Sequence, residues 1–385
     1  MSSMSSVIGK GSFGTVVRTS EDTVIKTIKI IDNKNFDYSA VSELCVLSTF
    51  SHPHMNTSLS HRKNDANLEI SMPYGGITLT KWTEKTGYLQ RIESIPNIAF
   101  QLLSVLAYLE KFSIAHSDIK PDNILIDENL RVTLIDWGSA ALNFTTRNYV
   151  GCTHITAAPE QFEYEFTSNK SDVFSLGMTI KFLIHGKYDI DDYDKYMSQQ
   201  DLLKKYKCIY PMVSKYAIPD HLMDVYDVLA LMLFMDPSDR PSASRLVGSK
   251  VFFERFGKPI KGIDPEEGLK VDCIAGSKHF TETEMNELTD WMKEVCFSVC
   301  ILDSVMDSAI NILNKYLAIE NSTKITELQK VGSACLLLSQ CLYSSGGEGA
   351  ECIGICDSAD NCFDVNELHE CAWKIGSTLG WKLWR

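Results

Sequence analysis

The chain has 385 residues, of which 44% are hydrophobic and 23% are charged, a composition typical of folded globular proteins rather than of disordered, collagenous or coiled-coil ones. Its 37 basic and 50 acidic side chains give a net charge of −13, which argues against general binding to nucleic acid or to an anionic membrane. The first residues lack the basic and apolar regions of a secretory signal, and no apolar run approaches the ~18–20 residues of a membrane helix. We therefore expect an intracellular protein, in the cytoplasm or in both cytoplasm and nucleus, that is not secreted and has no nucleic-acid or membrane partner.

The first two thirds of the chain change from strand-like to helical patterns. Short β-branched runs come first, at residues 14–18, 23–30 and 68–72. Residues 39–47 have a helical pattern, and longer helical patterns follow at 95–112, 172–184 and 222–235. This order predicts a small sheet-rich lobe, residues 1–74, followed by a larger helical lobe, residues 75–257.

The last third of the chain is predicted to be all-helical. Residues 258–270 contain Gly, Pro and charge without an apolar period and are interpreted as a linker. Beyond it, Thr281 and Glu284 have the spacing of a capping box, as do Asp364 and Glu367. Further helices are expected at 305–317, 325–342 and 365–379.

The charge is distributed unevenly along the chain. From residue 265 onward 19 acidic and 9 basic side chains give −10, so the earlier part carries about −3 and the two parts are differently built. The predicted fold class is α+β, with a separate helical domain at residues 271–385.

A glycine-rich loop near the N-terminus is the first candidate site. It contains Gly9, Gly11, Gly14 and Val16 in the pattern GxGxxGxV. In a dinucleotide site a helix should follow such a loop, whereas here a strand-like run follows. A glycine loop between two strands can fold over a triphosphate, with its backbone N–H groups facing the phosphate oxygens. Lys26 comes twelve residues after Gly14 and can pair with the phosphates, and Glu43 on the next helix can hold Lys26 in place.

The most specific string in the chain is His-Ser-Asp-Ile-Lys-Pro-Asp-Asn at residues 116–123. In this string Asp118 suits a proton acceptor for an attacking hydroxyl, and Lys120 suits a cation that neutralises a transferring phosphoryl group. Asn123 suits a metal ligand. The apolar run before Asp136 delivers one further carboxylate, which can bind a Mg²⁺ ion that bridges nucleotide phosphates.

Together with three further motifs, this order and spacing resembles the eukaryotic-type protein kinases over roughly residues 7–256. The further motifs are Ala-Pro-Glu at 158–160, Ser-Asp-Val-Phe-Ser-Leu-Gly at 171–177 and Asp-Pro-Ser-Asp-Arg-Pro at 236–241. The resemblance implies a bilobal kinase fold, an ATP and Mg²⁺ requirement, and a protein substrate with a Ser or Thr hydroxyl. The Asp-x-Lys pattern at Asp118, with Thr153 before Ala-Pro-Glu, is similar to serine/threonine kinases rather than tyrosine kinases.

The same resemblance implies roles for individual residues. The catalytic residues would be Asp118 as base, Lys120, and the ion pair of Lys26 with Glu43. Glu160 and Arg240 would form a structural ion pair, and the metal ligands would be Asn123 and Asp136. A hinge would lie at residues 72–75. The ATP-binding residues would be Ile8, Gly9, Lys10, Gly11, Gly14, Val16, Val24, Lys26 and Tyr74.

Within the kinases, residues 27–55 look most like cyclin-dependent kinases. Residues 37–43 stand where that family has its PSTAIRE helix. Ser42, Ser117 and Ala141 stand where the family has three arginines that clasp a phosphate on the activation loop. We therefore expect the loop to order itself without phosphorylation.

Residues 288–381 resemble a cyclin box, which implies a regulator that acts in cis on the kinase. Two family contact residues are absent, because Cys341 and Ala372 replace a lysine and a glutamate. We expect apolar packing to replace them, with Val41 facing residues 325–342. An unrelated helical bundle remains an alternative to the cyclin box. The main alternative function is a pseudokinase scaffold in which both domains bind partner proteins.

A zinc site is a further alternative, raised by the cysteines and the histidine near the C-terminus. These residues are Cys352, Cys356, Cys362, His369 and Cys371. Their spacing is not that of a CxxC pair, and buried thiols are common small core residues. The sequence therefore leaves the zinc alternative open.

Overall fold

The computed structural model describes residues 6–11, 14–32, 35–36, 38–64, 67–142, 145–146, 155–163, 166–187, 218–265, 280–299, 301–343, 352–359 and 362–383. The chain forms two compact units. Unit 1 consists of Met1–Phe50, Ser58–Met72 and Asp264–Arg385, and unit 2 of Ser51–Thr57 and Pro73–Ile263. The predicted hinge at residues 72–75 therefore contains the boundary between the units.

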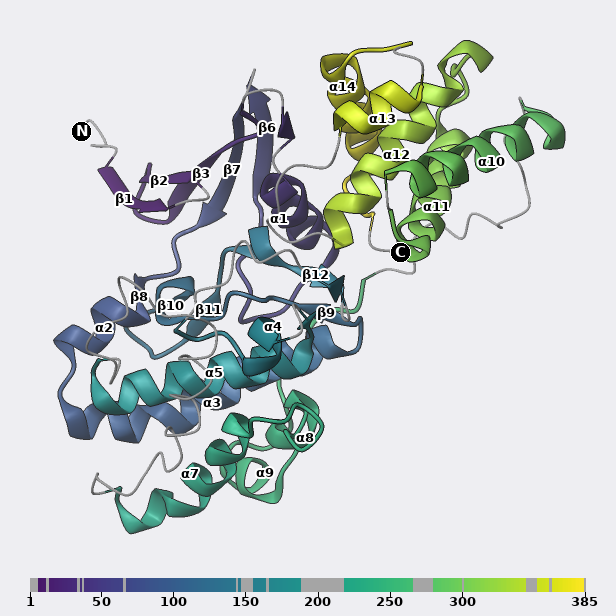
Figure 1. Ribbon diagram of the computed structural model, residues 1–385. Helices are drawn as coiled ribbons and strands as arrows, with labels where there is room; N and C mark the ends of the chain where they lie inside the picture. The colour runs from purple at the N-terminus through teal and green to yellow at the C-terminus, as the bar shows by residue number, and fades with distance from the viewer. Residues whose placement is uncertain are drawn as a thin grey trace. The chain divides into compact units, whose positions relative to one another are not determined.

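Unit 1 begins with a five-stranded sheet in the order β1-β2-β3-β7-β6 (Figure 1). The strands are β1 (Ser6–Gly11), β2 (Gly14–Arg18), β3 (Thr23–Lys29), β6 (Ser60–Asn64) and β7 (Asn67–Pro73). In β3 and β7 every second side chain is buried, as expected for a sheet with one covered face. The three strands predicted from β-branched runs are confirmed as β2, β3 and β7. Two short strands, β4 (Ile31–Asp32) and β5 (Asn35–Phe36), pair with each other before the first helix.

The first helix, α1 (Tyr38–Thr49), is buried along most of its length. All nine side chains from Ser39 to Leu47 are buried, including the polar ones of Ser42 and Glu43. A helix that packs on one layer keeps a polar face in water, so this burial requires covering elements on more than one side. Among the described elements, α1 has its most extensive contact with α12 (Leu328–Tyr343), which also lies in unit 1.

The helical part of unit 1 is a bundle centred on α12 (Figure 1). Around it lie α10 (Glu282–Ser298), α11 (Asp303–Ile319), α13 (Cys352–Ser358) and α14 (Val365–Thr378). The capping boxes predicted at Thr281 and Asp364 are both formed. The predicted helix at 325–342 begins with a 3₁₀ turn, η5 (Ile325–Glu327), a common way for an α-helix to start. Helix α13 was not expected from the sequence.

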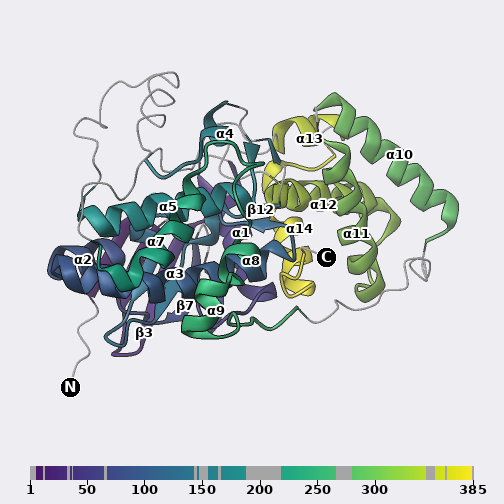
Figure 2. The ribbon, with the colours of Figure 1, turned by 90° about the horizontal axis from the view of Figure 1, so that it is seen from below.

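Unit 2 is built around the antiparallel neighbours α3 (Tyr88–Glu110) and α5 (Asn169–His185), which lie side by side (Figure 2). Helix α3 starts well before the predicted residue 95, and Pro96 lies inside it rather than at its first turn. The expectation that no apolar run approaches membrane length was wrong for α3, which is long and apolar enough to span a bilayer. Because 83% of that apolar window is buried inside the structure, α3 is the core helix of this unit.

The remaining elements of unit 2 are short. They are α2 (Leu79–Lys85), α4 (Pro159–Glu163), α7 (Met223–Ala230), α8 (Ala243–Val247) and α9 (Lys250–Phe256), the strands β8 (Ile77–Thr78), β9 (Ile114–Ala115), β10 (Ile124–Ile126), β11 (Val132–Leu134), β12 (Ala141–Leu142), β13 (Thr145–Thr146) and β14 (Phe166–Thr167), and the 3₁₀ turns η1 (Pro121–Asn123), η2 (Trp137–Ser139), η3 (Asp220–Leu222) and η4 (Leu231–Leu233). The helix predicted at 222–235 was too long, since α7 ends at Ala230 and tightens into η4. In η4, Met232 and Leu233 are buried and contact α5.

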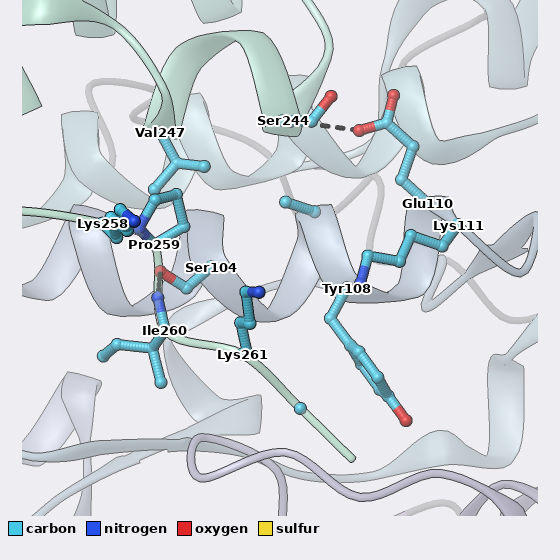
Figure 3. A pocket seen from close by; sticks show the side chains of 12 residues that line it. Ser104, Tyr108, Glu110, Lys111, Ser244, Val247, Lys258, Pro259, Ile260 and Lys261 are labelled. Atoms are coloured by element: carbon cyan, nitrogen blue, oxygen red, sulfur yellow. Dashed lines mark hydrogen bonds between the residues drawn. The ribbon is translucent and has the colours of Figure 1, made fainter. Parts of the chain in front are cut away.

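The segment after α9, interpreted from the sequence as the start of a linker, packs against unit 2. The backbone of Ile263 pairs with that of Ser51, and the Tyr108 hydroxyl of α3 donates a hydrogen bond to the Ile263 carbonyl at 2.5 Å. The Ile260 N–H donates to the Ser104 hydroxyl at 3.3 Å. A cavity of about 380 Å³ lies where this segment crosses α3 and α8 (Figure 3). Residues 258–263 therefore form an anchored strap.

Candidate active site

The glycine-rich sequence forms the hairpin between β1 and β2. Gly11 pairs with Gly14 at its end, and a strand follows the loop, as predicted, rather than a helix. Gly14 has a φ of +133°, and a Cβ there would lie 2.2 Å from the Thr27 carbonyl oxygen. No other residue fits this position, because both the backbone conformation and the space require glycine. The side chains of Ile8 and Lys10 are exposed, whereas Val24 on β3 is buried.

The predicted ion pair between Lys26 and Glu43 is formed. The Lys26 ammonium on β3 donates a hydrogen bond to Glu43 Oε2 on α1. Only 9% of the lysine side chain and 1% of the glutamate side chain are exposed. Because a buried charge is strongly disfavoured without its partner, each residue fixes the position of the other. The position of α1 thus determines where the Lys26 ammonium lies.

Three predicted catalytic residues come together in unit 2. The Lys120 ammonium donates a hydrogen bond to Asp118 Oδ2 at 2.8 Å. The Asn123 amide, on η1, donates to the same oxygen and to the Asp118 backbone carbonyl, both at 2.9 Å. One carboxylate oxygen therefore receives two donors, which fix its direction.

Asp136 lies close enough to the Asp118 region for both carboxylates to act on the same histidine. Burial lowers the pKa of His116, while the negative charges of Asp118 and Asp136 oppose that shift. The His116 ring lies 4.6 Å from the Trp137 ring, and its Nε2 lies 3.0 Å from the Ile135 carbonyl oxygen, to which a neutral ring can donate. Asp136 itself has a left-handed backbone, with a φ of +70°. Such strain is maintained only by surrounding contacts and is frequent at functional sites.

Asp172, near the start of α5, anchors the backbone before Asp118. Its two carboxylate oxygens accept hydrogen bonds from the N–H groups of His116 at 2.6 Å and Ser117 at 2.7 Å. Ser117 has a φ of +73°, and the bidentate acceptor holds that unfavourable conformation. Sequence reasoning noted the motif around Asp172 without giving this carboxylate a role. The sequence carried a weak signal, since Asp172 directly precedes the apolar residues 173–174, and a carboxylate buried there needs hydrogen-bond donors.

The predicted pair of Glu160 and Arg240 is also confirmed. The Arg240 guanidinium donates to both oxygens of Glu160, at 2.7 and 3.1 Å, and is fully buried. It also donates to the carbonyl oxygens of Phe234 and Lys170. This bidentate pair fixes the end of the Ala-Pro-Glu motif to the segment before α8.

The side-chain oxygen atoms of this site are of the kind that bind a hard divalent cation. The Asp136 carboxylate and the Asn123 amide would offer oxygen atoms to such a cation, and the Asn123 amide nitrogen donates to Asp118. Mg²⁺ is held in such sites by one or two protein oxygens together with substrate phosphates. In the described part of the chain no group of three or more His, Cys, Asp or Glu side chains is arranged to hold a metal by itself. The site therefore suits a cation that arrives with a nucleotide.

Some predicted residues lie outside the part of the chain that the structure describes. They are Ser12 and Phe13 of the glycine loop, Asp37 before α1, and Thr153. Tyr74 is described and half-buried at the start of unit 2. The glycine hairpin, Lys26 and Glu43 belong to unit 1, whereas Asp118, Lys120, Asn123 and Asp136 belong to unit 2.

Comparison with known families agrees with this geometry. The protein kinase domain matches residues 3–252, and the cyclin N-terminal domain matches residues 265–384. The first match covers more than half of the chain, so the chain belongs to the protein kinase family. It carries in addition a cyclin domain after the kinase domain. Both resemblances inferred from the sequence are confirmed, as is the fold class of a kinase fold followed by a helical domain.

Similar proteins come from distant organisms. Sperm motility kinase 3A of Mus musculus is 28% identical over 254 residues, which is 63% of this chain and 48% of that protein. Serine/threonine-protein kinase PrkC of Bacillus subtilis is 31% identical over 199 residues, 48% of this chain and 30% of that protein. Dual specificity mitogen-activated protein kinase kinase jkk-1 of Caenorhabditis elegans is 26% identical over 307 residues, 75% and 67% of the two chains. The chain spans about half the length of the first of these relatives.

Proposed function

We propose that this chain is an ATP-dependent serine/threonine protein kinase whose cyclin domain regulates it in cis. The arrangement around Asp118 supports the first half of this proposal. Asp118 accepts the proton of a Ser or Thr hydroxyl of a protein substrate, and Lys120 places a positive charge beside the transferring phosphoryl group. Asn123 and Asp136 hold Mg²⁺, which neutralises phosphate charge when bound.

The residues of unit 1 bind the nucleotide in this proposal. The backbone of the glycine hairpin faces the ATP phosphates, and Lys26 pairs with them while Glu43 keeps its ammonium in position. Ile8, Val16 and Val24 supply apolar contacts to the adenine, and Tyr74 belongs to the hinge. The protein acts inside the cell, as the sequence led us to expect.

The observation that supports regulation in cis is the burial of all nine side chains of α1 from Ser39 to Leu47. Glu43 lies on this helix, and α12 of the cyclin domain is its most extensive neighbour among the described elements. Removing α12 would expose apolar side chains of α1 and loosen the position of Glu43. The cyclin domain thus supports α1 through α12, α1 carries Glu43, and Glu43 positions the Lys26 ammonium.

A second contact joins the kinase sheet to the cyclin domain within unit 1. The Lys63 ammonium, on the edge strand β6, lies 5.3 Å from the centre of the Trp373 ring on α14. Trp373 meets the fully buried Trp381 edge to face, at 4.6 Å between ring centres. This cation–π contact and the α1–α12 packing take the place of the absent lysine and glutamate, at whose positions Cys341 and Ala372 are buried.

Phosphate transfer from Mg²⁺-ATP to a generic protein acceptor such as casein tests the proposal. The purified chain should transfer phosphate to Ser and Thr, and Asp118→Asn should lower kcat by about 10³-fold or more with little change in Tm. Asp136→Ala should do the same, because it removes a metal ligand. Glu128→Gln, which changes an exposed acid on the turn between β10 and β11, is the control and should keep full activity. Absence of transfer by the unchanged chain, in saturating ATP and Mg²⁺, would favour the pseudokinase scaffold.

A further inference from the structure

A buried pair of hydroxyl groups lies directly beside the proposed catalytic base. The Thr167 hydroxyl on β14 donates a hydrogen bond to Ser117 Oγ at 3.2 Å. Thr167 is fully buried and Ser117 is 3% exposed. Ser117 immediately precedes Asp118 in the chain, and its N–H is held by Asp172. Its side chain and its backbone are therefore anchored to two different parts of unit 2.

Thr167 connects this loop to a second segment. Strand β14 pairs with β13, with Thr167 opposite Thr145 and Phe166 opposite Thr146. The chain reaches β13 nine residues after Asp136, through β12, which pairs with β9 next to His116. We call residues 114–123, which contain Asp118, the catalytic loop. The segment that follows Asp136 is bound to this loop at two places, through the β12–β9 pairing and through Thr167.

We infer that the Ser117–Thr167 hydroxyl pair positions Asp118 by fastening the catalytic loop to the β13–β14 ladder. This inference rests on the proposed function, since it assigns the pair to the base of that reaction. Both hydroxyl groups are uncharged, so this hydrogen bond holds the loop without a phosphate and without an arginine to bind it. Buried hydroxyls that lose their partner are costly, which makes the two groups hold each other in one geometry. Both residues are positioning residues, because neither is placed to touch substrate.

Four variants of the full chain test this role. Thr167→Val keeps the side-chain shape and removes the donor, and Ser117→Ala removes the acceptor. Each should lower kcat about tenfold, the loss that corresponds to one buried hydrogen bond, while KM for ATP stays within about twofold. The double variant should be no slower than the slower single variant, because both changes break one contact. Thr167→Ser restores the hydroxyl and should recover most of kcat.

Thr179→Val is the matched control. Thr179 is also fully buried in unit 2, but its hydroxyl donates to the Ser175 carbonyl within α5 and has no bond to the catalytic loop. This variant should lower Tm about as much as Thr167→Val and leave kcat unchanged. Equal kcat losses in Thr179→Val and Thr167→Val, or additive losses in the double variant, would overturn the inference.

Backbone hydrogen exchange gives a readout that needs no activity. Thr167→Val should speed exchange at residues 114–118 and 145–146, and Thr179→Val should not. Unchanged exchange at both segments would also overturn the inference. If the unchanged chain transfers no phosphate, the proposed function fails, and the exchange measurement still decides whether the pair fastens the loop.

Discussion

The buried partners of Arg240 require an arginine at this position. Its guanidinium meets Glu160, three backbone carbonyls and the face of Phe174, 4.9 Å away, in a fully buried position. A cation in such a place is stable only with all its partners. The planar fork of arginine satisfies them, and a lysine would not.

We predict that Arg240→Met destabilises the protein by about 3–5 kcal/mol, because it leaves the Glu160 carboxylate buried without its cation. Denaturant unfolding measures this change. Lys250→Met is the control, since Lys250 and its neighbour Glu254 are 85% and 64% exposed. The control should change stability by less than about 0.5 kcal/mol. Equal effects of the two variants would contradict the burial argument.

Two buried histidines make the stability of the protein depend on pH. Burial lowers the pKa of His52, and that of His369, to about 4 from the ordinary value of 6.5. The unfolded chain therefore binds protons below pH 6.5 that the folded chain does not bind until about pH 4. Their contribution to stability is present above pH 6.5 and is lost as the pH falls toward 4.

We therefore predict that Tm decreases steadily between pH 7 and pH 5, as measured by scanning calorimetry. His52→Gln should make this decrease shallower, because one group no longer takes up a proton on unfolding. A slope that is the same in this variant and the unchanged chain would show that other groups dominate.

At the scale of elements, two described pieces of the activation loop, β12 and β13, are each held by strand pairing. Strand β12 pairs with β9 and β13 pairs with β14. Ser117 and Ala141 are buried where a phosphate clasp would need arginines. A phosphate on Thr145 or Thr146 would therefore meet no arginine at those positions.

We predict that treatment with a phosphatase leaves kcat within about twofold of the untreated protein. Thr145→Ala and Thr146→Ala should likewise remain active. Mass spectrometry confirms that phosphate has been removed. Loss of activity on treatment, reproduced by either alanine variant, would contradict the expectation.

The elements that the sequence predicted well are those whose end signals are local. The capping boxes at Thr281 and Asp364 start α10 and α14, because the cap and its partner lie three residues apart. The end of α7 was misjudged, since its apolar period continues past Ala230. Beyond Ala230 the backbone forms the 3₁₀ turn η4, which brings Met232 and Leu233 against α5. The contact is close because Gly177 of α5 has no side chain: a Cβ there would lie 2.7 Å from Leu233.

At the scale of the whole molecule, the strap at residues 258–263 changes where the tether begins. The sequence suggested a free connection from residue 258, but Tyr108 and Ser51 anchor the chain as far as Ile263. A cut meant to release the cyclin domain therefore belongs between residues 266 and 279.

We predict that cleavage of the folded chain at a protease site inserted in residues 266–279 leaves activity intact at micromolar concentration and lowers it at nanomolar concentration. The reason is the loss of an effective concentration of about millimolar that the tether provides. Trp373→Leu should raise the concentration at which the pieces separate, whereas Lys63→Arg, which keeps the cation–π contact, should not. Full activity of the cleaved protein at every dilution, with the pieces separated on a sizing column, would show that the cyclin domain is not an activator.

The sequence by itself predicted the protein kinase domain and the residues that meet around Asp118. Asp118, Lys120 and Asn123 lie within six positions, so their spacing nearly dictates that they meet around one carboxylate oxygen. The strand-like residues directly after Gly14 also argued against a dinucleotide site, in which a helix would follow the glycine loop.

Tertiary structure decided what holds these residues in place. Asp172 lies 55 residues from the Ser117 N–H that it accepts, and Thr167 lies 50 residues from the Ser117 hydroxyl. The packing of α1 on α12, almost three hundred positions further along the chain, was expected only from the resemblance to a cyclin box and not from any local pattern. Contacts at such separations are selected by packing and by the pairing of buried polar groups, which no local pattern of residues records.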